Sequence, residues 1–154
     1  MIDAPQITQT AEQNAAVIHL TISREEMPKV FGAAMDELME AIAVQGVSPA
    51  GPVFAHHLKM ESGIFDFELG VPVKEPVSAA GRVKPGKLPA ATVARTVYHG
   101  PYAGLPGAWG QFDAWIKSSG HTQAEDLWER YVDGPHSHPD PSDWRTELNR
   151  PLVD

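Results

Sequence analysis

The chain has 154 residues, of which 42% are hydrophobic and 21% are charged, and these fractions are ordinary for one globular domain. The formal net charge of −8 argues against a nucleic-acid surface, because binding to phosphates needs clustered lysine and arginine. No apolar run is long enough to predict a membrane span, and the absence of cysteine excludes disulfides and thiolate chemistry. The first residues lack the basic start and apolar core of a signal peptide, so a cytoplasmic location is the default expectation.

The first elements in chain order are a strand and an amphipathic helix. The polar segment 1–14 is expected to be extended or loose, and residues 17–22 (VIHLTI) are β-formers that predict a strand. Ser23 and Glu26 then match a capping box, in which the two side chains satisfy backbone amides at a helix start. Apolar residues follow at the three- and four-residue spacing of one buried helical stripe. They are Met27, Val30, Phe31, Ala34, Met35, Leu38 and Ile42. Gly46 is placed to end this helix.

Two strands and a connecting segment complete the first half of the chain, 15–76. Residues 53–60 predict a strand and 64–73 predict its hairpin partner. Pro72 places the end of that partner at a sheet edge, since proline cannot donate a ladder hydrogen bond. The stretch 74–89, rich in proline, glycine and lysine, is the expected crossover, and its middle is a further strand candidate.

The second half, 77–154, repeats this order of elements. Residues 91–98 predict a strand by their β-branched content, and a helix that ends at Gly120 follows. The apolar side of this helix carries Leu105, Ala108, Trp109, Phe112, Trp115 and Ile116. Residues 127–132 and 143–148 predict the last two strands.

A weak internal repeat relates the two halves. AGPVFAHHLKM and FELGVPV in the first half align with AEDLWERYVDG and RTELNRPL in the second, about 80 residues later. Each half alone is too small to close a core. We therefore predict a single α+β domain, 1–154, built from two βαββ units whose antiparallel sheet carries both helices.

The repeat also isolates one charged position. The alignment sets Ala55 against Glu129 and His57 against Tyr131, so only the second copy carries a carboxyl group at the position of Glu129. Strand alternation puts Leu127, Glu129 and Tyr131 on one face, where apolar neighbours would raise a carboxyl pKa. The pattern alone leaves open a second interpretation, in which Glu129 pairs with an arginine on a solvated edge.

The histidines do not follow the pattern of a metal site. His56-His57 and His136-Ser-His138 lack the spacing of known sites, and adjacent residues of a strand point to opposite faces. No nucleophile elbow, phosphate loop or zinc-binding helix motif is present. We therefore expect neither a metal nor a cofactor.

The second half carries motifs of a known family. HGPY, GLPGAWG, WERY, DGP and WRTE occur in this order between residues 88 and 153. In order and spacing they resemble the GyrI-like small-molecule-binding domains, which form the effector-binding half of AraC- and MerR-type multidrug regulators. The first half resembles the family chiefly through the duplicated architecture.

The resemblance implies a duplicated βαββ fold with a central cleft for bulky, flat and often cationic compounds. It also implies a glutamate in the middle of that cleft, at the position of Glu129. Further candidates for ligand contacts are Trp109, Tyr102, Tyr131, Tyr98, Phe54, His57 and Phe67. Trp109 also belongs to the buried helical stripe, so a core role and a cleft role both remain open.

Three functions are compatible with the resemblance. The favoured one is capture of a bulky aromatic or cationic molecule, as an effector-binding or drug-sequestering protein with Glu129 as the key polar group. The alternative is a hydrolase in which Glu129 activates water to open strained, cyclopropane-type electrophiles. The third is an inhibitor that binds DNA gyrase through its surface, which the dispersed acidic charge supports only weakly. No helix-turn-helix segment is present, so we do not expect the chain to be a complete regulator.

Overall fold

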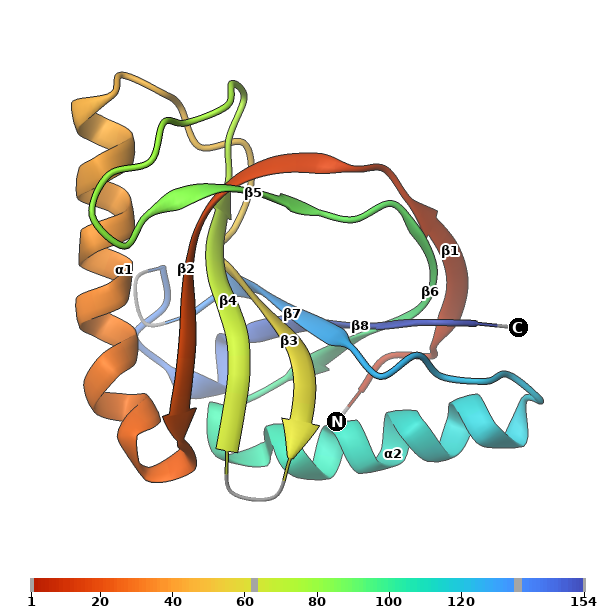
Figure 1. Cartoon of the computed structure of the whole chain (residues 1–154). Helices are drawn as coiled ribbons and strands as arrows, with labels where there is room; N and C mark the ends of the chain where they lie inside the picture. The colour runs from red at the N-terminus through yellow and green to blue at the C-terminus, as the bar shows by residue number, and fades with distance from the viewer. Residues whose placement is uncertain (1, 62–63, 135–136, 154) are drawn as a thin grey trace. The chain divides into compact units, whose positions relative to one another are not determined.

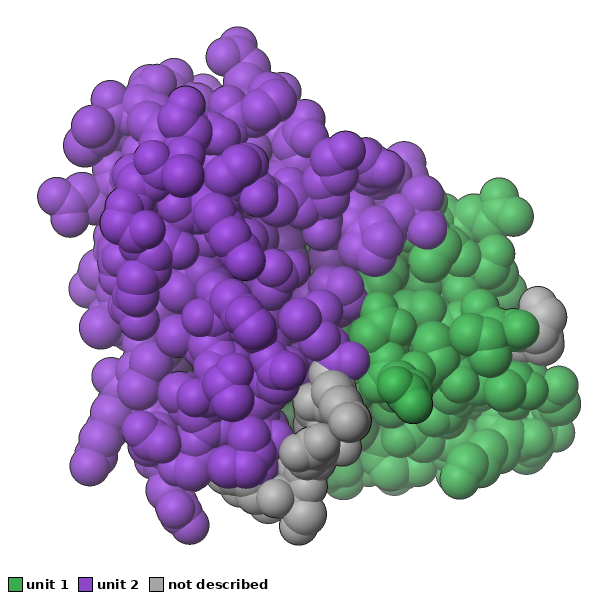
Figure 2. Space-filling model, viewed as in Figure 1, with its two compact units in different colours: residues 1–10, 91–154 green, residues 11–90 purple. Residues whose placement is uncertain are grey.

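The computed structural model describes residues 2–61, 64–134 and 137–153, and these residues form two compact units (Figure 2). Unit 1 comprises residues 1–10 and 91–154, and unit 2 comprises residues 11–90. In each unit the helix packs against one face of an antiparallel sheet (Figure 1). The predicted α+β class is therefore confirmed. None of the helices in the described ranges is both long and apolar enough to cross a membrane.

Unit 2 contains helix α1 and four strands in the sheet order β3-β4-β2-β5. Its elements are β2 (Gln13–Ser23), the 3-10 turn η1 (Arg24–Glu26), α1 (Met27–Val44), β3 (Phe54–Glu61), β4 (Ile64–Pro72) and β5 (Lys84–Leu88). The fully buried residues of α1, Ala34, Leu38 and Ile42, recur every fourth position, as the predicted stripe requires.

Both ends of α1 follow from local chemistry. The amide and the hydroxyl of Ser23 both donate to a carboxylate oxygen of Glu26, at 3.1 and 2.9 Å, so the capping is one-sided rather than reciprocal. These two bonds lower the pKa of Glu26. At the other end, Gly46 has φ +69°, and its amide and that of Val47 donate to the carbonyls of Ala43 and Ile42. This is a Schellman motif, which confirms Gly46 as the end of the helix.

The prediction for Pro72 needs a correction. Strand β4 lies between β3 and β2, so it is not an edge strand. Pro72 is tolerated because it is the last residue of β4, opposite Ala15, and its carbonyl accepts a hydrogen bond from the amide of Ala50 at 2.8 Å.

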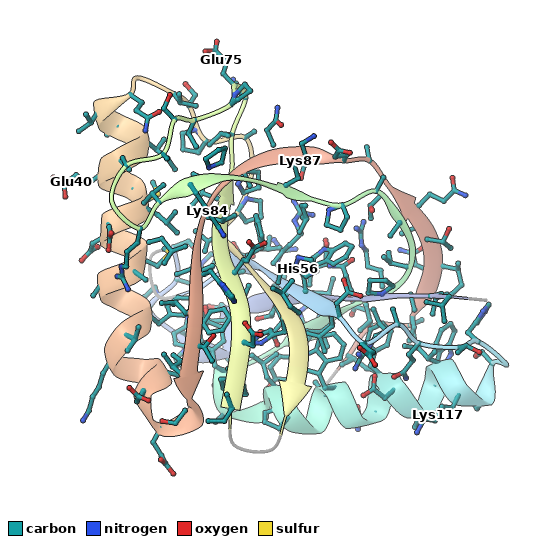
Figure 3. All side chains as sticks on the ribbon, in the orientation of Figure 1. Glu40, His56, Glu75, Lys84, Lys87 and Lys117 are labelled. Carbon is teal, nitrogen blue, oxygen red and sulfur yellow. The ribbon has the colours of Figure 1, made fainter. Side chains whose placement is uncertain are left out.

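Unit 1 contains helix α2 and four strands in the order β1-β6-β8-β7. Its elements are β1 (Gln6–Thr10), β6 (Ala91–His99), the 3-10 turn η2 (Tyr102–Gly104), α2 (Leu105–Ser118), β7 (Leu127–Asp133), the 3-10 turn η3 (Pro141–Asp143) and β8 (Arg145–Pro151). The core packs buried residues of α2 against the sheet. These residues are Ala108, Phe112 and Ile116 from α2, with Ala94, Tyr98 and Leu148 from the strands. Charged side chains such as Lys117 on α2, and Glu40 on α1 of unit 2, point away from the strands of their own unit (Figure 3).

The strand that precedes each half pairs within the opposite unit. β1 leads directly into β2 but pairs with β6, whereas β5 leads into β6 but pairs with β2. The unit boundaries therefore fall after residues 10 and 90, where the sequence indicated halves at 15–76 and 77–154. The polar segment 1–14 is extended over most of its length, because it supplies β1 and the start of β2.

The internal repeat is visible in the register of the two sheets. Ala55 lies opposite Leu69 in unit 2, and Glu129 lies opposite Leu148 in unit 1. The register then shifts after His57 in β3 and after Tyr131 in β7, two residues beyond Ala55 and Glu129. Both hairpins therefore bulge at the same place. Helix α2 ends at Gly120, φ +82°, by the same Schellman motif as α1. The two βαββ units are thus structural copies.

Candidate functional site

Glu129 lies in the middle of β7 and is only 8% exposed. Each of its carboxylate oxygens accepts a hydrogen bond from a neutral side chain. The indole Nε1 of Trp109 in α2 donates to Oε2 at 2.8 Å, and the hydroxyl of Tyr131 donates to Oε1 at 2.8 Å. Tyr131 lies two residues further along β7, so the predicted sharing of one strand face is confirmed.

The alternative interpretation of Glu129, as a solvated partner of an arginine, does not match this geometry. Among the described residues of this unit, it is Glu147 that pairs with arginine, and its carboxylate lies 3.1 Å from Arg130. Glu129 therefore holds a carboxyl group among an indole, a phenol and the sheet.

A tight turn places the start of α2 beside this site. The buried ring of Tyr98 lies under the turn, and its hydroxyl donates to the carbonyl of Pro101 at 2.9 Å. A Cβ atom on Gly104 would lie 2.0 Å from that hydroxyl, so the turn can rest on Tyr98 only because residue 104 is glycine. Tyr98, a candidate ligand contact, thus belongs to the core that positions Tyr102 and α2.

Aromatic rings extend the site beyond Glu129. The ring of Tyr102 meets that of Tyr131 edge-on, with centroids 5.8 Å apart, and lies 4.8 Å from the ring of Trp144. The indole of Trp144 is fixed by its Nε1 hydrogen bond to the carbonyl of His138 at 2.8 Å. Trp144 was not among the predicted contacts. Its place in the WRTE motif, just before β8, was the available signal.

Burial governs the protonation of these groups. It raises the pKa of Glu129, and the hydrogen bonds from Trp109 and Tyr131 oppose that rise by stabilising the carboxylate. Burial and the nearby charge of Glu129 raise the pKa of Tyr102, and they raise the pKa of Tyr131 well above its usual range. Both phenols therefore keep their protons at neutral pH, and the hydroxyl of Tyr131 remains a hydrogen-bond donor to Glu129.

The remaining candidates are in unit 2, where His57 and Phe67 are in contact and Phe54 lies on the other face of the sheet. The ring of His57 stacks on Phe67, with centroids 5.0 Å apart, and meets Phe65 edge-on at 5.5 Å. Burial, followed by the charge of His56, lowers the pKa of His57 to about 4, so its ring is neutral at physiological pH. Phe54 is buried, and its ring covers Gly70 so closely that a Cβ there would lie 2.5 Å from Phe54 Cζ.

Within the described part of the chain, no three His, Asp or Glu side chains lie close enough together to hold a metal ion. His136, one of the histidines in the His-Ser-His sequence, lies outside the described residues.

The chain matches a family model of small-molecule-binding domains over nearly its whole length. The family model of the GyrI-like small molecule binding domain matches residues 3–152, so the chain belongs to that family. The resemblance seen in the sequence is therefore confirmed. No curated protein matches the chain at a significant level.

Several solved structures share the fold. The C-terminal domain of EcmrR superposes with a TM-score of 0.86 at 19% identity, and the match covers 98% of both chains. In the complex of EcmrR with DNA, this chain spans 57% of the EcmrR chain, with a TM-score of 0.84 and 20% identity.

SAV2435 bound to tetraphenylphosphonium gives a TM-score of 0.71 at 12% identity and covers 98% of this chain and 94% of its own. A hydrolase from Listeria innocua gives 0.67 at 11% identity, with coverage of 97% and 91%. At these identities the likenesses establish the fold.

Proposed function

We propose that this chain binds bulky aromatic or cationic small molecules at the Glu129 site of unit 1, as an effector-binding or drug-sequestering domain. The observation that carries the proposal is the buried carboxyl group of Glu129, which is held by two neutral donors, Trp109 and Tyr131. A carboxylate that has lost its water is stabilised strongly by a cation placed beside it. A cationic ligand supplies that charge.

The aromatic side chains support a delocalised cation rather than a metal ion. The faces of Tyr102, Tyr131 and Trp144 offer large apolar area, and their quadrupoles attract positive charge. Tetraphenylphosphonium, the cation in the SAV2435 structure, combines bulk, aromatic rings and a charge that cannot hydrogen-bond. It is therefore a suitable first probe.

The test is a calorimetric titration of the purified chain with tetraphenylphosphonium at neutral pH. We expect Glu129→Gln to lower the affinity by about tenfold or more, or about 1.4 kcal/mol, because the amide keeps the shape but loses the charge. The control is Glu125→Gln, which removes an exposed carboxylate just before β7. Equal affinity in the wild type and both variants would contradict the proposal.

A second candidate function is hydrolysis of strained electrophilic rings, and the raised pKa of Glu129 favours it. A carboxyl group whose pKa lies closer to neutrality is a better general base for water than an ordinary glutamate. Mass spectrometry after incubation with cyclopropane-containing alkylators tests this function. Ring-opened product with the wild type, and none with a Glu129→Gln variant that still binds, would support the enzyme. Intact compound in every sample would exclude it for those substrates.

A further inference from the structure

Arg150 of β8 packs against the indole that holds Glu129. The guanidinium carbon of Arg150 lies 5.4 Å from the centroid of the Trp109 ring, within the range of a cation–π contact. One of its terminal nitrogens lies 3.4 Å from the carboxylate of Asp113 in α2, and the other donates to the carbonyl of Ala124 at 3.3 Å. The side chain of Arg150 is only 11% exposed. Arg150 is therefore fixed at both ends of its guanidinium and covers the ring of Trp109.

Unit 2 shows what the same fold looks like without these residues. Two residues are equivalent when they lie at the same distance before Gly46 and Gly120, or at the same register position in the paired strands. Trp109, Asp113, Glu129 and Arg150 correspond to Met35, Met39, Ala55 and Val71. All four partners in unit 2 are apolar, yet its helix, strands and register match those of unit 1. The βαββ fold therefore does not require this connected set of polar side chains.

We propose that Arg150 and Asp113 are positioning residues of the Glu129 site, which hold the Trp109 indole so that its N–H stays on the carboxylate. Asp113 and the Ala124 carbonyl orient the guanidinium, and the guanidinium restrains the ring by lying over its face. Neither residue contacts Glu129 in the described structure; they act through Trp109. The consequence for ligand binding rests on the proposed function above.

The proposal has a direct electrostatic consequence. The hydrogen bond from Trp109 opposes the burial that raises the pKa of Glu129, so a loosened indole lets that pKa rise further. Among the described residues of this unit, the other titratable groups that interact with Glu129 are Tyr131 and Tyr102, and the variants below leave both unchanged. Loss of Arg150 or Asp113 should therefore move the titration of Glu129 to higher pH, in the same direction as loss of Trp109.

The ligand-free protein provides the first test. The indole N–H resonance of Trp109, assigned by its absence in Trp109→Phe, reports the bond to Glu129 and should follow the titration of that carboxyl group in a pH series of NMR spectra. We expect Arg150→Met and the milder Asp113→Asn to raise the midpoint by about half a pH unit, or threefold in the protonation constant. Arg150→Lys should raise the midpoint less than Arg150→Met does. A midpoint unchanged in both Arg150→Met and Asp113→Asn would overturn the proposal.

The second test is a double-mutant cycle on tetraphenylphosphonium affinity with Trp109→Phe and Arg150→Met. If Arg150 acts through the indole, the double variant binds no more weakly than Trp109→Phe alone. Additive losses would show that Arg150 acts elsewhere. The control is Arg82→Met, which removes an arginine paired with a helix carboxylate in unit 2. It should change neither the midpoint of the NMR titration nor the affinity for tetraphenylphosphonium. Because the NMR titration needs no ligand, a raised midpoint without cation binding would contradict the proposed function and leave the positioning role intact.

Discussion

Glu129 is held in a balance that an ordinary surface glutamate does not experience. Burial favours its neutral form, whereas the hydrogen bonds from Trp109 and Tyr131 favour its charged form, and the net result is a raised pKa. Ionisation of this carboxyl group therefore costs the folded chain more free energy than ionisation of an exposed glutamate would cost. A cation of the proposed kind would offset that cost by supplying the opposite charge.

The raised pKa of Glu129 predicts how stability depends on pH. Between the ordinary glutamate pKa of 4.5 and the higher pKa of the folded chain, the folded state binds more protons than the unfolded state. The free energy of unfolding of the wild type should thus fall as pH rises through this window, by roughly 1.4 kcal/mol for each tenfold difference between the two protonation constants. Glutamine does not titrate, so Glu129→Gln lacks this fall. Urea unfolding of both proteins at about pH 4 and about pH 8 measures the difference, and a difference that does not change with pH would contradict the prediction.

At the residue scale, sequence patterns located the carboxyl group but not its full surroundings. The repeat singled out Glu129, because only one copy carries a charge there. The helical spacing of Trp109 was equally compatible with a core residue, and its bond to Glu129 depends on where α2 packs. Asp113, Trp144 and Arg150 were not predicted at all, since their contacts join segments far apart in the chain.

At the scale of elements, the turn before α2 depends on one close contact. The missing side chain of Gly104 makes room for the Tyr98 hydroxyl, which would lie 2.0 Å from a Cβ atom at residue 104. We expect Gly104→Ala to destabilise the chain by about 1–3 kcal/mol, as other overpacked positions do. The control is Gly107→Ala, because a Cβ at Gly107 meets nothing within 4 Å and alanine favours the helix.

The contact itself can be tested by removing its other partner. In a Tyr98→Phe background, the closest clash with residue 104 disappears, although the ring carbon that bore the hydroxyl would still lie 2.9 Å away. Gly104→Ala should therefore cost less in that background than in the wild type, as measured by urea unfolding. Equal costs in the two backgrounds would mean that the Tyr98 hydroxyl is not what excludes a side chain at this position.

The elements that local patterns define were predicted well. Both helices end at the predicted glycines, Gly46 and Gly120, because a positive φ at a helix end is a local requirement. The strand β1 was not distinguished from a loose segment, since it is polar and gains its hydrogen bonds from β6, about 85 residues away. Pro72 was misplaced at an edge for the same reason: which strand lies beside β4 is decided by non-local pairing.

At the scale of the whole molecule, duplication separates what the fold needs from what the site needs. The two units share helix ends, strand register and the position of a bulge. They differ in the connected set around Glu129, whose counterparts in unit 2 are apolar. The same backbone architecture therefore forms with a buried carboxyl group and its partners in unit 1 and with apolar residues in unit 2. The set of side chains around Glu129 is not needed for the fold itself.

This difference predicts that the carboxyl group cannot simply be copied into unit 2. Ala55 is fully buried, and the position equivalent to Trp109 is Met35, whose side chain has no N–H to donate. Ala55→Glu should destabilise the chain by about 3 kcal/mol or more at neutral pH, because a buried charge would lack the indole donor and the supporting pair.

The comparison with Ala55→Gln isolates the charge from the added volume. Both side chains overfill the space of an alanine, but only glutamate ionises, so the gap between the two variants should narrow as pH falls and the new carboxyl group is protonated. Adding Met35→Trp to Ala55→Glu should recover part of the loss if α1 can present an indole to β3 as α2 does to β7. Urea unfolding of the three variants measures these differences. If Ala55→Glu were as stable as Ala55→Gln at neutral pH, the surroundings of Ala55 would already satisfy a charge, and the asymmetry between the units would not explain why only unit 1 carries Glu129.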